Sequence, residues 1–373
     1  MGILSTNSLP VRTKPGSNSP LTGKVPPGSS AWRSSVKNAI RSSAALREML
    51  QLPLEDDKVQ ASGEANLSGT EVVERSAGEA GEDYGFPVFV PREYAARIEK
   101  GNLEDPLLLQ VLPQAREAAE LPGFVGDPVG DNMATLAPGL IQKYQGRALL
   151  ITTGVCAVHC RYCFRRHFPY GESKMDAQST RVAMDHLRAD KSIDEVILSG
   201  GDPLMLTDDG LKALVDQIAG IEHISRLRIH TRLPVMIPSR INEPLLEWLT
   251  ETRLTPVMVL HANHPAELDC PDVAAAIARL SSAGVPLLNQ AVLLRGINDD
   301  VETLTSLSRD LVNLRVMPYY LHLLDKVAGA AHFDVSQERG EELIAELRKV
   351  LPGYAIPRLA QEVAGELGKR VLA

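Results

Sequence analysis

Three cysteines lie within eight residues of one another, and their spacing is the clearest chemical feature of this 373-residue chain. Cys156, Cys160 and Cys163 form the pattern C-x3-C-x2-C, whereas Cys270 is more than a hundred residues away. A structural zinc site normally closes with four ligands, and a ferredoxin-type cluster also takes four thiolates. A four-iron cluster held by only three cysteines leaves one iron open to an outside ligand. The spacing therefore favours a [4Fe-4S] cluster with an open coordination position.

The main alternative for the cysteines is a zinc site that uses a histidine as its fourth ligand. His159 and His167 both lie within or just after the cysteine pattern. The spacing alone leaves the iron–sulfur and zinc interpretations open.

Composition limits the cellular setting and the kind of ligand. Four cysteines are too few for a secreted disulfide framework in a chain of this length, and the N-terminus lacks the apolar stretch of a secretion signal. The formal net charge is -8, and no basic stripe stands out. We therefore expect a cytoplasmic protein that acts on a small molecule, without nucleic-acid or membrane partners.

The cysteines follow the first of six short apolar runs that alternate with amphipathic stretches, a pattern typical of βα units around a parallel sheet. We predict strands at 148–153, 195–199, 227–231, 257–260, 286–293 and 315–321. Six units are two fewer than a complete (β/α)8 barrel has. We therefore predict an α/β fold, a partial (β/α)6 TIM-like barrel. Its functional groups should lie where strands end and loops begin.

The rest of the chain divides into regions around this barrel. Residues 1–31 are rich in Ser, Pro and Gly, and we predict that they are disordered. Residues 32–140 should form a helical N-terminal region that contains an acidic low-complexity linker at 55–84 and one helix from Trp32 to Leu50. The barrel should occupy 141–334, and a C-terminal helix and tail should follow at 335–373.

Two segments of the barrel resemble a known superfamily. The sequence CAVHCRYC matches the signature of radical S-adenosylmethionine (SAM) enzymes, whose partial barrels bind a [4Fe-4S] cluster. The sequence LSGGDPL, at the end of the second predicted strand, resembles the segment that receives the amino group of SAM. The resemblance implies that Gly200, Gly201 and Asp202 contact SAM, whereas a Gly-Gly pair alone indicates only a turn.

Further blocks are similar to the lysine 2,3-aminomutase family, whose members also use pyridoxal 5'-phosphate (PLP). These blocks include RYCFRRHFPY, RIHTRLPVMIPSRI, LLNQAVLLRGIND and PYYLHLLDKVAGAAHF, in the same order as in that family. The resemblance implies that Lys369 is the lysine that binds PLP. It also implies that Tyr144 packs on the PLP ring and that Arg147 binds the phosphate, for which a guanidinium is well suited.

The same resemblance assigns the substrate contacts. Arg165 matches the arginine that pairs with the amino-acid carboxylate, and Arg166 is interpreted as a surface charge. Asp325 and Glu362 match the two acids that hold the distal ammonium of lysine. Gln290 is a candidate contact to SAM or substrate.

The resemblance implies an isomerase that converts L-lysine to (R)-β-lysine, and the blocks are most similar to those of members that serve elongation factor P. It implies an electron-donating reductase or flavodoxin, and a functional link to a lysyl ligase for elongation factor P. One alternative is an aminomutase for another amino acid, such as glutamate. A second carboxylate on the substrate would need cations where Asp325 and Glu362 stand, so these two acids argue against it. Another is a non-catalytic iron–sulfur or zinc module, which would not need Arg147, Arg165 and Lys369 together.

Overall fold

A computed structural model describes residues 31–53, 73–74, 83–173 and 175–373. The predicted disorder of the N-terminus and nearly all of the predicted linker therefore lie outside the described residues. No helix within the described ranges is long and apolar enough to cross a membrane.

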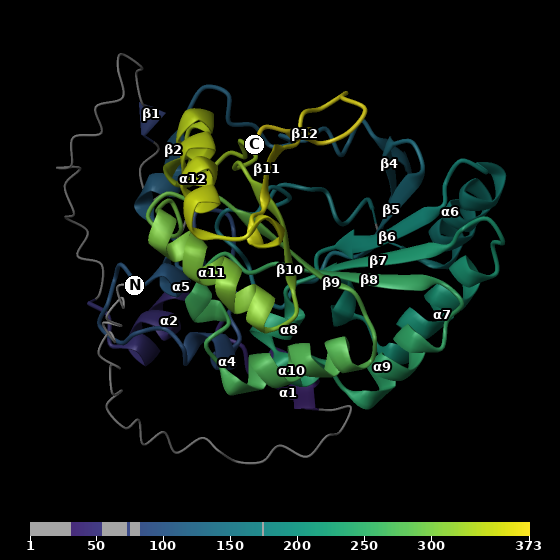
Figure 1. Cartoon of the computed structure of the whole chain (residues 1–373), viewed down its shortest axis with the longest axis horizontal. Helices are drawn as coiled ribbons and strands as arrows, with labels where there is room; N and C mark the ends of the chain where they lie inside the picture. The colour runs from purple at the N-terminus through teal and green to yellow at the C-terminus, as the bar shows by residue number, and fades with distance from the viewer. Residues whose placement is uncertain (1–30, 54–72, 75–82, 174) are drawn as a thin grey trace, which may run out of the picture.

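The centre of the fold is a curved ten-stranded sheet that contains all six predicted strands (Figure 1). Strands β5 to β11 run parallel, whereas β3, β4 and β12 pair antiparallel at the two edges. The strands, in spatial order from one edge to the other, are β3 (Thr135–Ala137), β4 (Leu140–Tyr144), β5 (Arg147–Thr153), β6 (Glu195–Gly200), β7 (Arg226–Thr231), β8 (Thr255–Leu260), β9 (Leu287–Val292), β10 (Met317–His322), β11 (Arg358–Gln361) and β12 (Arg370–Val371). A separate antiparallel pair joins β1 (Val73–Glu74) to β2 (Ala119–Glu120). The partial barrel is thus confirmed, and its sheet extends by two strands at each edge of the six predicted ones.

Helices form an arc around the strands (Figure 1). The barrel helices are α6 (Ala177–Ala189), α7 (Asp208–Ala219), α8 (Leu233–Met236), α9 (Glu243–Thr250), α10 (Pro271–Ser282), α11 (Val301–Asn313) and α12 (Gln337–Val350). Most begin at a capping side chain; Asp176, Thr207 and Asp300, for example, each accept a backbone N–H of the first turn. Short 3-10 turns lie at 115–118, 203–205, 238–240, 265–267, 331–333 and 353–355.

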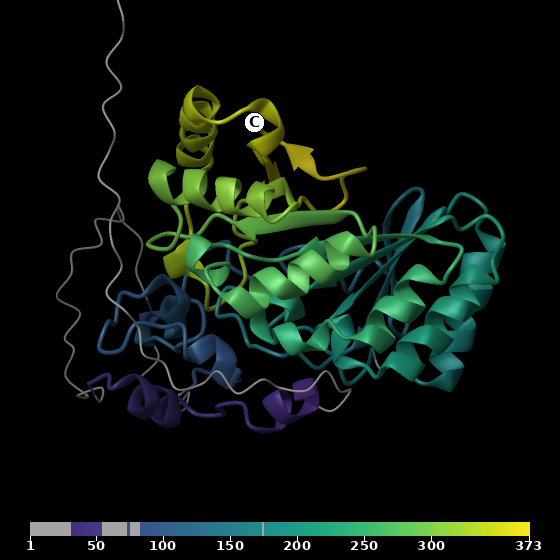
Figure 2. The same ribbon diagram turned by 60° about the horizontal axis from the view of Figure 1, so that its bottom comes forward.

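The N-terminal region lies against one end of the barrel (Figure 2). Its helices are α1 (Ala31–Lys37), α2 (Ser43–Leu50), α4 (Arg92–Ala95) and α5 (Pro106–Leu109). The prediction of one helix from Trp32 to Leu50 is wrong, because the chain leaves the helix after α1. Ile40 and Val90 exchange both backbone hydrogen bonds, and Ser42 then caps α2. A pairing between distant segments therefore outweighs the local helical pattern.

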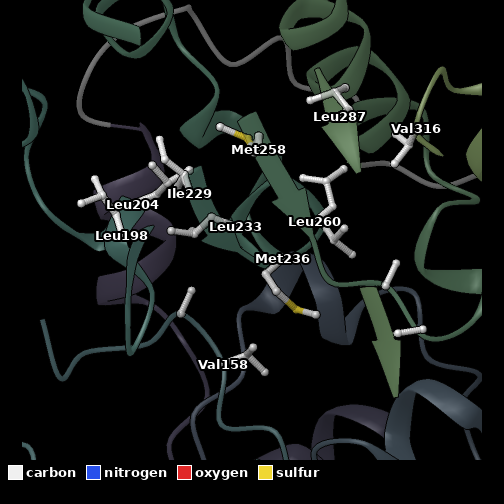
Figure 3. Close-up of a cluster of buried hydrophobic side chains, with 14 of the residues drawn as sticks. Val158, Leu198, Leu204, Ile229, Leu233, Met236, Met258, Leu260, Leu287 and Val316 are labelled. Carbon is white, nitrogen blue, oxygen red and sulfur yellow. The ribbon is translucent and has the colours of Figure 1, made fainter. Parts of the chain in front are cut away.

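The core lies between the sheet and its helices. Leu198, Ile229, Met258 and Leu287 come from four neighbouring strands and are almost completely buried (Figure 3). Parallel strands covered on both faces are apolar along most of their length, which is why these runs are visible in the sequence.

The two edges of the sheet meet through side chains. The hydroxyl of Tyr144, at the end of β4, donates a hydrogen bond of 2.5 Å to Oε1 of Glu362, which follows β11. Lys143 Nζ lies 3.6 Å from the same oxygen. The backbone adds one isolated bridge nearby, between Val125 and Val327. The barrel is thus closed along a seam, defined here as Lys143 and Tyr144 facing Glu362, in which no continuous strand pairing is present among the described residues.

Candidate functional site

The three cysteines lie in one loop that follows β5. Their thiols are free, and they are close enough that Cys160 and Cys163 add to the effect of burial in raising the pKa of Cys156. The loop is fixed to the N-terminal region because Arg161 N donates to Gln110 O at 2.9 Å and His159 N to Phe89 O at 2.9 Å. The thiols are therefore gathered on a loop whose backbone is held from both sides.

The histidines required by the zinc alternative face other groups. His159 Nδ1 lies 2.8 Å from the carbonyl oxygen of Pro87, and His167 Nε2 lies 3.1 Å from that of Ala328. Within the described part of the chain, no three potential ligands converge as they would around one metal ion. Cluster thiolates bind different iron atoms and need not converge on one point, so this loop fits a cluster better than a single zinc ion.

Gly200 and Gly201 let the end of β6 approach the base of the cysteine loop. Gly201 N donates to Thr153 O at 2.7 Å, and Asp202 N donates to Val155 O at 2.9 Å. A Cβ on Gly201 would lie only 2.4 Å from the carbonyl oxygen of Val155, and Gly200 has a φ of +126°. Both positions therefore require glycine for a structural reason.

The carboxylate of Asp202 faces the interior of the protein. It accepts hydrogen bonds from the Thr231 hydroxyl at 2.8 and 2.9 Å, from Arg232 N at 2.8 Å and from Leu204 N at 3.1 Å. Burial raises its pKa to about 6 despite these hydrogen bonds. The side chain joins the ends of β6 and β7, and its contact with SAM remains a prediction.

Lys369 contacts one of the two acids assigned to the substrate ammonium. Its Nζ is 3.0 Å from Oε2 of Glu362 and 5.9 Å from the centre of the Tyr320 ring. Glu362 also accepts the hydroxyl of Tyr144. The guanidinium of Arg147 stacks 4.5 Å above the ring of Tyr144. An amine, an aromatic ring and a guanidinium, the three groups expected to hold PLP, are thus brought together.

The pKa values of Asp325 and Glu362 are shifted in opposite directions. Burial raises the pKa of Asp325 to about 7, with Lys369 opposing the rise and Glu362 adding to it. Burial also acts on Glu362, but Lys369, the Tyr144 hydroxyl and Lys143 outweigh it and hold the pKa of Glu362 below its usual value. Among the described residues Asp325 has no ion pair, and the positive charges of Lys369 and Lys143 act on it without outweighing burial; an ammonium ligand would add a closer one.

Arg165 is oriented by a buried acid. Its Nε donates to Oδ2 of Asp131 at 2.6 Å, and one terminal nitrogen donates to the Ser199 hydroxyl at 3.1 Å. Asp131 also pairs with Lys143 at 2.6 Å, and Lys143 in turn approaches Glu362. A chain of charges therefore links the predicted carboxylate site to the predicted ammonium site.

Gln290 lies on the inner face of the barrel between two histidines. Its Nε2 is 3.4 Å from His230 Nδ1 and 3.3 Å from His261 Nε2. Burial, together with nearby positive charges, lowers the pKa of both imidazoles, that of His261 to about 3. Neutral imidazoles and an amide form a polar, uncharged wall, and the role of Gln290 as a ligand contact remains a prediction.

One residue differs from its sequence interpretation, and three were not identified. Arg166 is not a surface charge, because its side chain is 1% exposed and pairs with Glu117 at 2.9 Å. Asp131, Lys143 and Arg232 were missed because each acts through a contact with a residue distant in sequence. The only sequence signal for these three residues is a charged side chain in a segment otherwise rich in glycine or apolar residues.

The residues predicted to bind PLP phosphate and the cluster lie at opposite ends of one strand. Arg147 begins β5 and the cysteine loop follows its end, so the seven residues of the strand separate them by about 23 Å.

Comparisons with known proteins identify the family of this chain. The Radical SAM superfamily matches residues 150–255, which contain the cysteine loop and the Gly-Gly segment. An L-lysine 2,3-aminomutase of Haemophilus influenzae is 44% identical over 92% of this chain and 95% of its own length. The L-lysine 2,3-aminomutase of Escherichia coli is 48% identical over 77% of this chain and 83% of its own. A radical SAM methyltransferase structure from Sphaerobacter thermophilus aligns with 60% of this chain and 68% of its own at a TM-score of 0.43 and 18% identity.

The partial barrel with its three-cysteine loop is a radical SAM enzyme. The extent and identity of the matches show more, and the chain belongs to the L-lysine 2,3-aminomutase family of isomerases. Membership of this family implies a [4Fe-4S] cluster, SAM and PLP as cofactors. The three thiols of one loop, with no fourth cysteine nearby, fit the cluster, and the group of Lys369, Tyr144 and Arg147 fits PLP.

Proposed function

We propose that this enzyme converts L-lysine to (R)-β-lysine in a PLP-dependent reaction, and that the product serves the modification of elongation factor P. The observation that carries the proposal is a chain of charges: Lys369 pairs with Glu362, and Glu362 is linked through Lys143 and Asp131 to Arg165. Asp325 lies close enough to Lys369 and Glu362 for both to affect its pKa. Arg165 at one end of this chain of charges is complementary to the carboxylate of lysine, and Glu362 and Asp325 at the other end are complementary to its ε-ammonium.

In this proposal, Arg165 pairs with the α-carboxylate of lysine. Asp131 and Ser199 fix the plane of the guanidinium, so less entropy is lost when the carboxylate binds. Asp325 and Glu362 hold the ε-ammonium, and the ammonium supplies the ion pair that buried Asp325 lacks among the described residues. A substrate held at both ends presents its central carbons to the same part of the barrel in every turnover.

Lys369 would bind PLP, with Tyr144 against the ring and Arg147 on the phosphate. PLP supplies the conjugated system through which nitrogen moves from C2 to C3, and the cluster with SAM supplies the radical. Cys156, Cys160 and Cys163 would hold three irons. The Gly200–Gly201 segment, which lies against the loop, would place SAM beside the fourth.

The function is tested under anaerobic conditions. The protein is reconstituted with iron, sulfide, SAM and PLP, given L-lysine and dithionite, and its products are resolved by chiral chromatography with mass detection. (R)-β-lysine that depends on both SAM and PLP is the expected result. SAM cleavage without β-lysine would retain the radical chemistry and overturn the substrate assignment.

A variant separates the enzyme from a binding module. Lys369→Ala should lose both the absorbance of bound PLP and turnover, whereas Lys349→Ala, which alters an exposed lysine on α12, should keep both. Full turnover by Lys369→Ala would show that the PLP assignment is wrong.

The proposed link to elongation factor P is tested by supplying the product to the lysyl ligase of that factor. Transfer of the product to the factor is then measured as an increase in its mass.

A further inference from the structure

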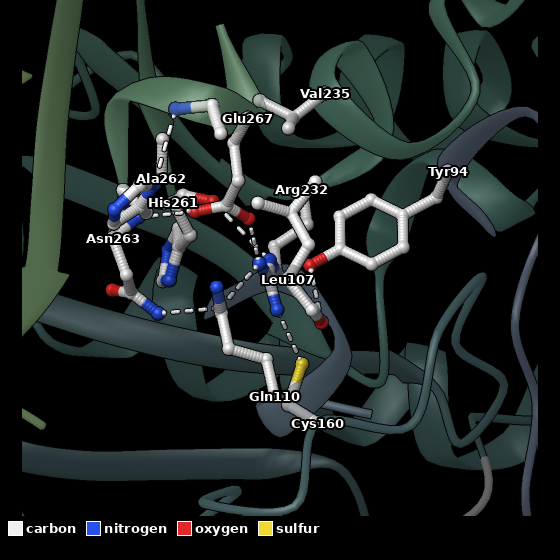
Figure 4. Close-up of polar contacts among 12 residues, drawn as sticks. Tyr94, Leu107, Gln110, Cys160, Arg232, Val235, His261, Ala262, Asn263 and Glu267 are labelled. Carbon is white, nitrogen blue, oxygen red and sulfur yellow. Dashed lines mark hydrogen bonds and ion pairs between the residues drawn. The ribbon is translucent and has the colours of Figure 1, made fainter. Parts of the chain in front are cut away.

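Arg232 follows β7 and is directed at a thiol of the cysteine loop. One terminal nitrogen of its guanidinium donates to Sγ of Cys160 at 2.8 Å (Figure 4). Cys156 and Cys163 have no side-chain hydrogen-bond donor within the described part of the chain. Arg232 thus distinguishes one of the three thiols from the other two.

The position of the guanidinium is fixed by its remaining hydrogen bonds. Nε donates to the carbonyl oxygen of His261 at 3.2 Å, and the second terminal nitrogen donates to Gln110 Oε1 at 3.1 Å and also pairs with Glu267. Cys160 therefore receives a donor whose direction is set by three other groups (Figure 4).

The acceptors of Arg232 are themselves held. Gln110 Nε2 donates to the carbonyl oxygen of Pro106 at 3.1 Å, so the Gln110 oxygen is turned toward Arg232 and toward Asn263, whose Nδ2 donates to it at 3.0 Å. Glu267 is fully buried and accepts the backbone N–H groups of Asn263 and His264 at 2.5 and 3.0 Å. An ion pair with Glu267 alone would not require the further hydrogen bonds from Arg232 to Gln110, to the carbonyl oxygen of His261 and to Cys160.

We propose that Arg232 is a positioning residue that raises the reduction potential of the cluster by donating a hydrogen bond to the Cys160 thiolate. Uptake of one electron makes the cluster more negative, so a cationic donor at one of its thiolates stabilises the reduced form more than the oxidised form. Hydrogen bonds to cluster sulfurs are among the factors that set such potentials. The inference rests on the proposed assignment of Cys160 as a cluster ligand.

The experiment is a potentiometric titration of the reconstituted protein, followed by electron paramagnetic resonance of the reduced cluster, with dithionite as the electron donor and without SAM. Arg232→Lys keeps the charge but removes the planar fork that reaches Cys160 and Glu267 together. We expect the equilibrium constant for reduction to fall about tenfold, which is about 59 mV for a one-electron couple.

The matched control is Arg240→Lys. Arg240 is as deeply buried, donates to the carbonyl oxygens of Leu204 and Leu206 and pairs with Asp208, but it contacts no cysteine. Its substitution should leave the potential unchanged. A shift as large as that of Arg232→Lys would show that the change reflects loosened packing and would overturn the inference.

Glu267→Gln is the second variant. It retains Arg232 and removes the negative charge that faces it, so the potential should rise, opposite to the shift for Arg232→Lys. Equal potentials in the wild type and both variants would also overturn the inference. If the wild type itself forms no four-iron cluster, the cysteine assignment fails, a result that is distinct from a cluster whose potential ignores Arg232.

Discussion

Asp131 accepts a hydrogen bond of 2.6 Å from Nε of Arg165 while its other oxygen lies 2.6 Å from Nζ of Lys143. Both neighbours are cations, and they hold the pKa of Asp131 below its usual value although burial acts to raise it. Asp131 is therefore a fixed negative charge that orients the predicted carboxylate-binding arginine.

Asp131→Asn should weaken the binding of lysine. The amide keeps the shape of the side chain but loses the charge that holds Arg165 and Lys143 in place. We expect the KM for lysine to rise about 10- to 100-fold, which corresponds to the loss of one hydrogen bond to a charged group, with a smaller effect on kcat. Steady-state kinetics measures this change. Asp185→Asn, in an exposed ion pair on α6, should leave KM unchanged.

The binding of lysine should depend on pH through Asp325. Because burial raises the pKa of Asp325 to about 7, the carboxyl must lose a proton before it can pair with an ammonium. The KM for lysine should therefore rise about tenfold for each pH unit below about 7 and level off above that pH. Asp325→Asn should have a high KM that lacks this dependence. A wild-type KM that stays constant from pH 6 to pH 8 would contradict the assignment.

A rise in pH should strengthen the binding of lysine through Asp325 but lower the stability of the ligand-free protein. Between the usual pKa of aspartate and about 7, the folded protein binds more protons at Asp325 than the unfolded chain does. Its free energy of unfolding should therefore fall as the pH rises through this window. Without ligands, Asp325→Asn should be more stable than the wild type at pH 7.5, and the difference should shrink as the pH falls toward 4. Chemical denaturation at several pH values measures this difference.

Gly201→Ala should disturb the cysteine loop. The added methyl group would lie 2.4 Å from the carbonyl oxygen of Val155, so β6 and the loop must move apart. We expect a loss of about 1–3 kcal/mol in stability and a lower iron content after reconstitution. Gly171→Ala is the control, because a methyl group there would meet no atom within 4 Å. Equal iron content in the two variants would show that the loop tolerates the displacement.

Arg147→Ala should weaken the binding of PLP. The guanidinium stacks on Tyr144, and its loss removes the cation predicted to meet the phosphate. Because charge-assisted bonds to phosphate are strong, we expect the dissociation constant to rise at least about tenfold in an absorbance titration. Arg226→Ala, which removes a half-exposed arginine at the start of β7, should leave the constant unchanged.

The barrel could be predicted from the sequence because its signals are local. Buried parallel strands appear as short apolar runs, and all six were found at nearly their observed positions. Three of the four outer strands, β3, β11 and β12, have two to four residues each, too few for a recognisable pattern. The fourth, β4, has five residues, of which only the first two are fully buried, so it gives no apolar run.

The site could be predicted only where a recognisable motif or family block carried the signal. The cysteine spacing is such a motif, whereas the contact between Tyr144 and Glu362 joins residues 218 positions apart. Arg232 follows a strand in a segment whose pattern contains no hint of Cys160. Contacts of this kind depend on how the sheet curves, and that information is spread over the whole chain.

The seam has a consequence for the order in which the enzyme is assembled. Because Tyr144, Lys143 and Glu362 meet through side chains, breaking these contacts separates β4 from the tail while every strand pairing of the sheet stays intact. Lys369 is seven residues beyond Glu362, on the same tail. The attachment of the segment that carries Lys369 to β4 therefore depends on side-chain contacts rather than on strand pairing, so a substitution of Glu362 should loosen this attachment and leave the hydrogen bonds of the sheet in place.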